Sequence, residues 1–259
     1  MYGQFFILFG LILVGYYCNK KGYLPLETNK NVGHMVMRVT IPAMLITTIA
    51  GIEITDRVLK AFLFSAAGQA AMMVVFGFLM RQYGRKRGLD SRLLPMLDLT
   101  AGSLNTGFIG LPVTMIFFGQ AGIIYMSAGV LALNLYLWSY GVYLISDKKA
   151  TGAAAIGKSF LQGAINPNCI SILLGLLLAV THTARFVPTV VLGFLTKVGD
   201  LSTPLSLIYI GALAGGSGIV QLFKEKMALE ISVVKMIGMP ALAILAMLFI
   251  PADGLAKSV

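Results

Sequence analysis

The chain has 259 residues, of which 58% are hydrophobic and only 12% are charged. Soluble domains carry about 25% charged residues, so this composition excludes an ordinary soluble protein and indicates a multi-pass integral membrane protein. We attribute the net charge of +10 to membrane loops and not to a nucleic-acid-binding surface.

Eight apolar segments follow one another along the chain, and each is expected to form a membrane helix. A span needs about 20 residues, so the short first and sixth segments must extend into their flanks. The first has no basic residue before it and is followed directly by Lys20 and Lys21, so we expect it to be retained rather than cleaved. The segments are residues 2–18, 31–51, 58–80, 91–118, 121–146, 168–181, 188–215 and 227–250.

Loop charge predicts the orientation of these segments. Most of the basic residues fall in connections 1–2, 3–4, 5–6 and 7–8, whereas the other connections hold Arg57, Lys60 and Arg185. Because basic loops stay in the cytoplasm, the N-terminus is predicted to lie outside, in a protein of the inner (cytoplasmic) membrane.

The fourth segment contains a polar, helix-breaking stretch at residues 104–112. Asn105, Thr106, Gly107, Gly110 and Pro112 lie within it. Glycine and proline weaken a helix, and a broken helix in a membrane needs a cavity or protein partners for its main-chain groups. We predict a substrate site here, where a second half-helix beginning near residues 110–112 would direct its N–H groups at an anion. The alternative is a proline kink with glycines for close packing.

Three other polar residues lie inside apolar segments. Gln69 and Asn134 either reach the substrate or hold helices together by hydrogen bonds. Asp200 is a candidate proton acceptor or coupling-ion ligand, because an acid deep in a membrane segment is a functional candidate. Its alternative is an ion pair with Lys197 or Arg38.

Self-comparison indicates an internal repeat. Residues 7–13 align with residues 172–178, and Thr40 and Pro42 align with Ser202 and Pro204. The repeat covers five helices, and an odd number inverts the second copy in the membrane. We therefore predict an all-α fold with a first five-helix repeat at residues 1–150 and an incomplete second repeat, helices 6–8, at residues 151–259. The partner of Asn105 would lie at about position 267, so the chain is expected to be a shortened form, lacking two helices, of a protein of about 310 residues.

The residues at 105–112 resemble the helix-4 motif of the auxin efflux carrier family, which includes plant PIN proteins and bacterial malate-permease-like carriers. Residues 166–168 and 199–207 resemble that family more weakly. The resemblance implies ten helices in two inverted repeats, two broken helices that cross at the substrate site, and elevator-like transport of organic anions such as carboxylates. Leu104 stands where plant members usually carry proline, which makes auxin itself a poor candidate substrate.

The leading interpretation is a secondary active transporter, an efflux carrier or permease, of small organic anions. No zinc motif, nucleophile elbow or workable carboxylate pair is present in the sequence, so we predict no enzyme activity, metal site or cofactor. One alternative is a channel or uniporter, which should show a continuous polar stripe. Another is a non-transporting fragment that forms a homodimer to cover apolar faces left by missing helices.

Overall fold

The computed structural model describes residues 2–145, 165–216 and 226–249, and every regular element in these ranges is helical. The proposed repeat boundary at residue 150 and the tail from residue 250 lie outside the described residues. In chain order the helices are α1 (Tyr2–Lys20), α2 (Leu26–Met35), the π-helical turn η1 (Val36–Thr40), α3 (Ile41–Ala50), α4 (Asp56–Lys86), α5 (Leu94–Gly102), the π-helical turn η2 (Thr106–Gly110), α6 (Leu111–Tyr136), the π-helical turn η3 (Leu137–Gly141), α7 (Val142–Ile145), α9 (Pro167–Val180), the 3-10 turn η4 (Thr183–Phe186), α10 (Thr189–Asp200), α11 (Ser202–Gly216) and α13 (Lys226–Phe249).

Every predicted apolar segment lies mainly on one or more of the described helices. Five described stretches are long and apolar enough to cross a membrane, and one of them, Leu94–Leu144, contains the predicted fourth and fifth segments. Those two are divided at Gly119, whose φ of 63° and ψ of −156° interrupt the helix. Glycine reaches that backbone region without the steric cost of a side chain. The all-α membrane class is confirmed.

The outer faces of several helices are apolar. Large hydrophobic side chains on α1, α9 and α10 remain exposed, as expected for helices surrounded by lipid. They include Phe6, Phe9, Leu13, Leu173, Leu177, Val190 and Phe194.

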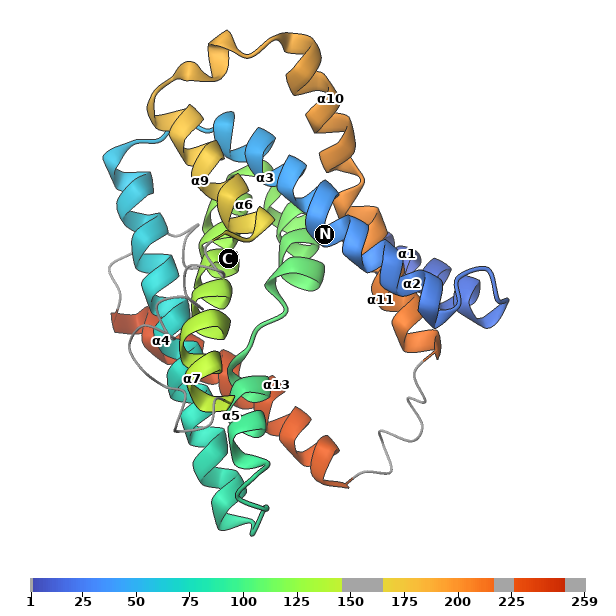
Figure 1. Cartoon of the computed structure of the whole chain (residues 1–259), viewed down its shortest axis with the longest axis vertical. Coiled ribbons are helices and arrows are strands. Elements are labelled where there is room, and N and C mark those ends of the chain that lie inside the picture. The colour runs from blue at the N-terminus through green and yellow to red at the C-terminus, as the bar shows by residue number, and fades with distance from the viewer. Residues whose placement is uncertain (1, 146–164, 217–225, 250–259) are drawn as a thin grey trace.

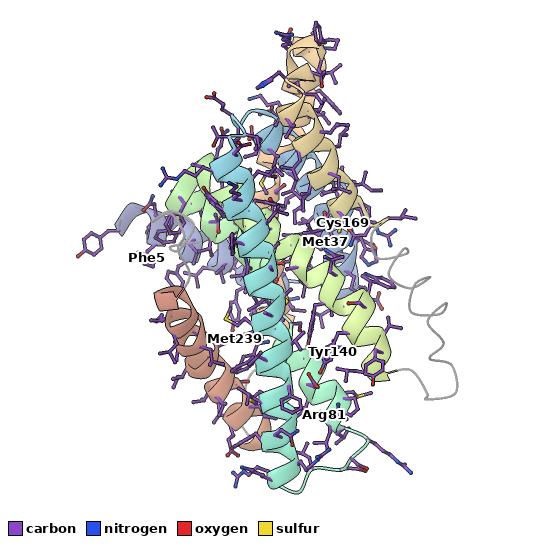
Figure 2. All side chains as sticks on the ribbon, turned by 90° about the vertical axis from the view of Figure 1, so that its left-hand side faces the viewer. Phe5, Met37, Arg81, Tyr140, Cys169 and Met239 are labelled. Atoms are coloured by element: carbon purple, nitrogen blue, oxygen red, sulfur yellow. The ribbon has the colours of Figure 1, made fainter. Side chains whose placement is uncertain are left out.

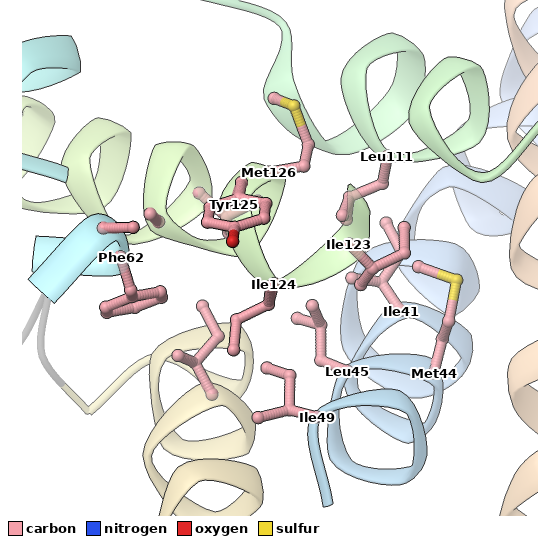
Figure 3. Close-up of a cluster of buried hydrophobic side chains, with 14 of the residues drawn as sticks. Ile41, Met44, Leu45, Ile49, Phe62, Leu111, Ile123, Ile124, Tyr125 and Met126 are labelled. Carbon is pink, nitrogen blue, oxygen red and sulfur yellow. The ribbon is translucent and has the colours of Figure 1, made fainter. Parts of the chain in front are cut away.

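The helices gather around two close-packed pairs and one long helix (Figure 1). α1 packs along α11, and α9 packs along α3. α4 runs beside α5 and α6, with α13 against its lower part as drawn. The largest buried cluster joins Ile41, Leu45 and Ile49 of α3 to Phe62 of α4 and to the α6 side chains between α3 and α4 (Figure 3). A second cluster joins α4, α5 and α13 and includes Met239, which lies beside α4 in Figure 2.

Glycine permits the contact between α1 and α11. A Cβ atom built on Gly211 would lie 1.9 Å from the carbonyl oxygen of Ile12, and one on Gly15 would lie 2.0 Å from that of Ile208. Apolar association is weak between helices in lipid, so packing of this closeness supplies much of the attraction. The α1–α11 pair therefore depends on the absence of two side chains.

Gly211→Ala is expected to separate α1 from α11 and to lower the apparent melting temperature of the purified protein in detergent. Gly193→Ala is the matched control, because nothing lies within 4 Å of a Cβ at Gly193 in α10. There alanine should be neutral or stabilising by roughly 0.5–1 kcal/mol, the difference in helix propensity. Equal melting temperatures for the two variants would contradict this account of the pair.

Candidate functional site

The fourth segment is interrupted, as predicted, between α5 and η2. α5 ends at Gly102, Ser103 is extended with φ −68° and ψ 134°, and Asn105 has φ −86° and ψ 68°. Figure 1 shows the chain crossing this gap as a strand-like connection between the two helical parts. The interruption consists of residues Ser103–Asn105, which precede Gly107, Gly110 and Pro112 in the chain.

The second half-helix begins with the π-helical turn η2 at Thr106, earlier than predicted, whereas its regular α-helical part, α6, begins at Leu111, within the predicted residues 110–112. The side chain of Asn105 caps it, because its Oδ1 accepts a hydrogen bond of 3.2 Å from the Phe108 N–H. Pro112 at the start of α6 lacks an N–H, and the turn before it widens so that Gly110 N–H donates to Asn105 O at 2.9 Å. A π-helical turn accommodates a proline that a regular α-helix would reject.

The residues of the motif differ in exposure. Asn105 is exposed, whereas Thr106 and Gly107 are buried. Gly107 lies against Met37 of η1, and a Cβ at Gly110 would lie 2.5 Å from the Met126 methyl group in α6. These glycines thus allow close packing, as the alternative interpretation of the motif expected, at the same place where the helix is broken.

Thr106 differs from the other polar residue of the motif, Asn105, in how its side chain is bonded. Its hydroxyl is buried, and Thr106 Oγ1 has no hydrogen-bond partner among the described residues. A buried hydroxyl without a partner costs free energy, roughly 1–3 kcal/mol, so such a group calls for an explanation. A ligand bound beside the cap would supply the missing partner.

Gln69 of α4 lies near the break, and Asn134 of α6 lies farther along. Gln69 Oε1 would be 2.2 Å from a Cβ at Gly129, three residues along α6 from Met126, the residue that meets Gly110. Asn134 is roughly 12 Å along α6 from Met126 at 1.5 Å per residue. It donates to Val130 O at 2.8 Å and accepts from Asn166, the cap of α9. Roles in substrate binding stay predictions for both residues.

Asp200 is the last residue of α10 and lies away from the interruption of the fourth segment. It lines a pocket of about 60 Å³ with Met44, Thr47 and Thr48 of α3, Met115 and Gln120 of α6, and Thr196 and Gly199 of α10. Among the described residues no ion pair joins Asp200 to Lys197 or Arg38, so that alternative is not observed. Its role as a proton acceptor or ion ligand stays a prediction.

Two charged groups that the sequence did not place in the site are found at α5: Asp98 belongs to this helix, and Lys235 contacts its end from α13. Asp98 is fully buried, with Arg81 Nη1 at 3.8 Å and the Tyr140 hydroxyl at 3.0 Å from its Oδ2. Arg81 and Tyr140 are labelled in Figure 2. Lys235 of α13 donates to Thr100 O and Ser103 O at the end of α5, at 2.9 and 2.8 Å. In the sequence, Lys235 is notable only because it lies within an apolar segment, and that position does not identify the groups it contacts.

The comparisons with known proteins agree with a membrane transport role. A family model described as membrane transport protein matches residues 1–259. The chain is also 26% identical over 204 residues to a protein from Methanothermobacter thermautotrophicus described as an uncharacterized transporter. That match covers 78% of this chain and 64% of the relative, so the chain spans less than two thirds of the length of the relative it matches.

Arg81→Met is expected to destabilise the protein, because it leaves the buried Asp98 carboxylate without its cation. The cost should be roughly 2–3 kcal/mol, below the range for a fully buried pair, since the Arg81 side chain is 31% exposed. The double variant Arg81→Met/Asp98→Asn removes both charges and keeps an acceptor for Tyr140, so it should melt at a higher temperature than Arg81→Met alone. Additive losses in the double variant would contradict a coupled pair.

Proposed function

Because this chain belongs to the membrane transport protein family, the family of the auxin efflux and malate-permease-like carriers, we propose that it is a secondary active transporter of small organic anions such as carboxylates. The resemblance found in the sequence is thereby confirmed at the level of the family. The anion would bind at the interruption of the fourth segment. The observation that carries this proposal is the exposed cap of Asn105 beside the buried, unpartnered Thr106 hydroxyl.

The chemistry of the break suits an anion. A helix that begins at Thr106 has N–H groups in its first turn that lack main-chain acceptors, and its N-terminal end carries a partial positive charge. Asn105 offers an amide donor and Thr106 a hydroxyl, so a carboxylate can be held by neutral groups.

The packing of the outer helices supports an inverted repeat and therefore alternating access. In an inverted repeat, a two-fold axis exchanges segment 1 with segment 6 and segment 2 with segment 7. If segment 1 packs against segment 7, segment 6 must therefore pack against segment 2. α1 packs on α11 through Gly15 and Ile208, and α9 packs on α3 through Gly175 and Ile49. In both pairs a glycine of the earlier segment of its copy meets an isoleucine of the other copy, although the repeat aligns Gly175 with Gly10 and not with Gly15.

The second and seventh segments also deviate from regular helix at matching places. η1 precedes Pro42, and the junction between α10 and α11 at Leu201 precedes Pro204. The two prolines are the residues that the repeat aligns. Since proline removes a main-chain donor, each irregularity has the same local cause, and the two copies would bend in the same way.

We propose an elevator-like movement for the cycle. α4, α5 and α13 share one buried cluster and would carry the break as a unit. The α1–α11 and α3–α9 pairs would form the stationary part. The predicted orientation, with the N-terminus outside and the basic loops in the cytoplasm, belongs to this proposal; Lys20 ends α1, and Arg85 and Lys86 end α4.

Asn105→Ala is expected to abolish uptake of radiolabelled malate by proteoliposomes that contain the 259-residue chain, because it removes both the cap and the amide donor. Asn105→Asp keeps the acceptor for the Phe108 N–H but puts a negative charge at the site, so it should remain folded and also lose uptake. Thr55→Ala removes the equivalent cap of α4, where Thr55 accepts from the Val58 N–H at 3.3 Å.

Each cap should stabilise the protein by about 1 kcal/mol, so Asn105→Ala and Thr55→Ala should melt alike. Only Thr55→Ala should retain uptake. Normal uptake by Asn105→Asp would rule out anion binding at this residue, and uptake that fails in every variant and in the parent chain would rule out malate as a substrate.

A further inference from the structure

The C-terminal end of α5 presents carbonyl groups that have no main-chain donor; one of them, Thr100 O, accepts a hydrogen bond of 3.2 Å from the Ser103 hydroxyl. The Ser103 N–H closes the last turn on Leu99 O, and the chain then becomes extended. The carbonyl oxygens that follow Leu99 have no further helical N–H groups to accept from, and they form the negative end of the helix dipole. The interruption therefore creates a site for a cation as well as a site for an anion.

Lys235 of α13 occupies that end. Its ammonium group donates to Thr100 O and Ser103 O, so it bridges the last turn of α5 and the first extended residue. The side chain arrives from a helix more than a hundred residues away in the sequence, and Figure 1 shows α13 crossing beside α5. Both of these acceptors are main-chain carbonyl oxygens, the ligand type that binds Na⁺ at half-helix ends in other transporters with broken helices.

Contacts on either side of Lys235 hold its helix in place. Five residues earlier, Glu230 accepts hydrogen bonds from Tyr83 of α4 and from Arg87, which follows that helix. A few residues later, Gly238 lies 3.1 Å from Phe76, measured from a Cβ built on the glycine, and Met239 packs in the buried cluster of α4, α5 and α13. The packing of α13 against α4 therefore positions the Lys235 ammonium group beside the end of α5.

We propose that Lys235 is a tethered cation that replaces a soluble metal ion at the broken helix. The ammonium would stay on the α5 carbonyl oxygens through the transport cycle, so neither Na⁺ nor K⁺ binds at this end of the break. The proposal rests on the proposed transport function for its role in the cycle, whereas the cation site itself is a property of the folded chain. Removing the ammonium while leaving space should convert the position into a site for a free cation.

Thermal stability of the purified chain in mild detergent tests the site without any substrate. The parent protein should melt at the same temperature in sodium, potassium and choline chloride of equal ionic strength. Lys235→Ala should melt roughly 5 °C lower in choline chloride, because the carbonyl oxygens of Thr100 and Ser103 lose their charged donor. Methylammonium chloride should restore part of that loss, since the ion fits where the lysine head was.

Three variants serve as controls. Lys235→Met should be as unstable as Lys235→Ala but not restored by methylammonium, because its side chain fills the space. Lys235→Arg keeps a positive charge and should melt nearer to the parent protein than Lys235→Met does. Lys197→Ala removes an exposed lysine of α10 and should change neither the melting temperature nor the response to methylammonium.

Several results would overturn the proposal. A parent protein that melts higher in sodium or potassium than in choline binds a soluble cation after all. The ammonium group has no such role if Lys235→Ala is as stable as the parent protein. The same conclusion follows if Lys235→Arg is as unstable as Lys235→Met, or if Lys197→Ala shows the same response to methylammonium.

Malate uptake by proteoliposomes tests the role in the cycle. Uptake by the parent chain should not change when sodium is replaced by choline, whereas Lys235→Ala should lose roughly tenfold in rate and regain activity with methylammonium. If the parent chain takes up no malate, the proposed substrate is wrong, and the melting experiments still decide on the cation site. Sodium-dependent uptake by the parent chain would reject the tethered cation even if malate is transported.

Discussion

The structure depends on how it satisfies the main-chain groups freed where the fourth segment breaks. A helix interrupted within apolar surroundings has donors at one cut end and acceptors at the other, and neither set can be left without partners. Asn105 caps the donor end, and Lys235 takes the acceptor end. The two ends are therefore stabilised differently: one by a neutral side chain beside an exposed surface, the other by a charge from a separate helix.

This difference accounts for the arrangement around α5. Lys235 can reach the α5 carbonyl oxygens only because α13 is held against α4, and Asp98 on the same short helix is held between Arg81 and Tyr140. A helix of nine residues would be marginal alone. Its ion pair, its lysine cap and its buried cluster with α4 and α13 join these elements into one unit, which is consistent with the elevator-like movement proposed here.

Close glycine contacts organise the other part of the molecule. α1 meets α11 at Gly15 and Gly211, and α9 meets α3 at Gly175, at distances that leave no room for a Cβ atom. Such contacts resist sliding because each depends on a particular register. The break itself touches this part through Phe108, whose ring stacks on Tyr209 of α11 at 4.5 Å between centroids. An aromatic contact of this kind is easier to exchange than the backbone contacts of the pairs.

Local chemistry made much of the protein predictable from its residues. The membrane class follows from composition, and the helix ranges follow from runs of apolar residues. The polar and helix-breaking residues at 104–112 predicted an interruption in the fourth segment, although the non-helical residues, Ser103–Asn105, lie before the glycines and the proline. The same reasoning, which gave weight to Gly110 and Pro112, located the start of the regular helix α6. It overlooked the turn η2 that precedes α6 and the Asn105 side chain that caps it, although capping by asparagine is itself a local property.

The partners of buried polar groups could be decided only by tertiary structure. Which basic residue near the connection between the third and fourth segments pairs with Asp98 was decided by the packing of α4 on α5, which places Arg81 beside it. Likewise, no pattern links Lys235 to Thr100 and Ser103, because hydrogen bonds between distant segments depend on which helix faces meet. What the sequence alone determined is where the chain crosses the membrane and where one crossing must break; which side chains stabilise the two ends of that break was decided by the packing of helices far apart in the chain.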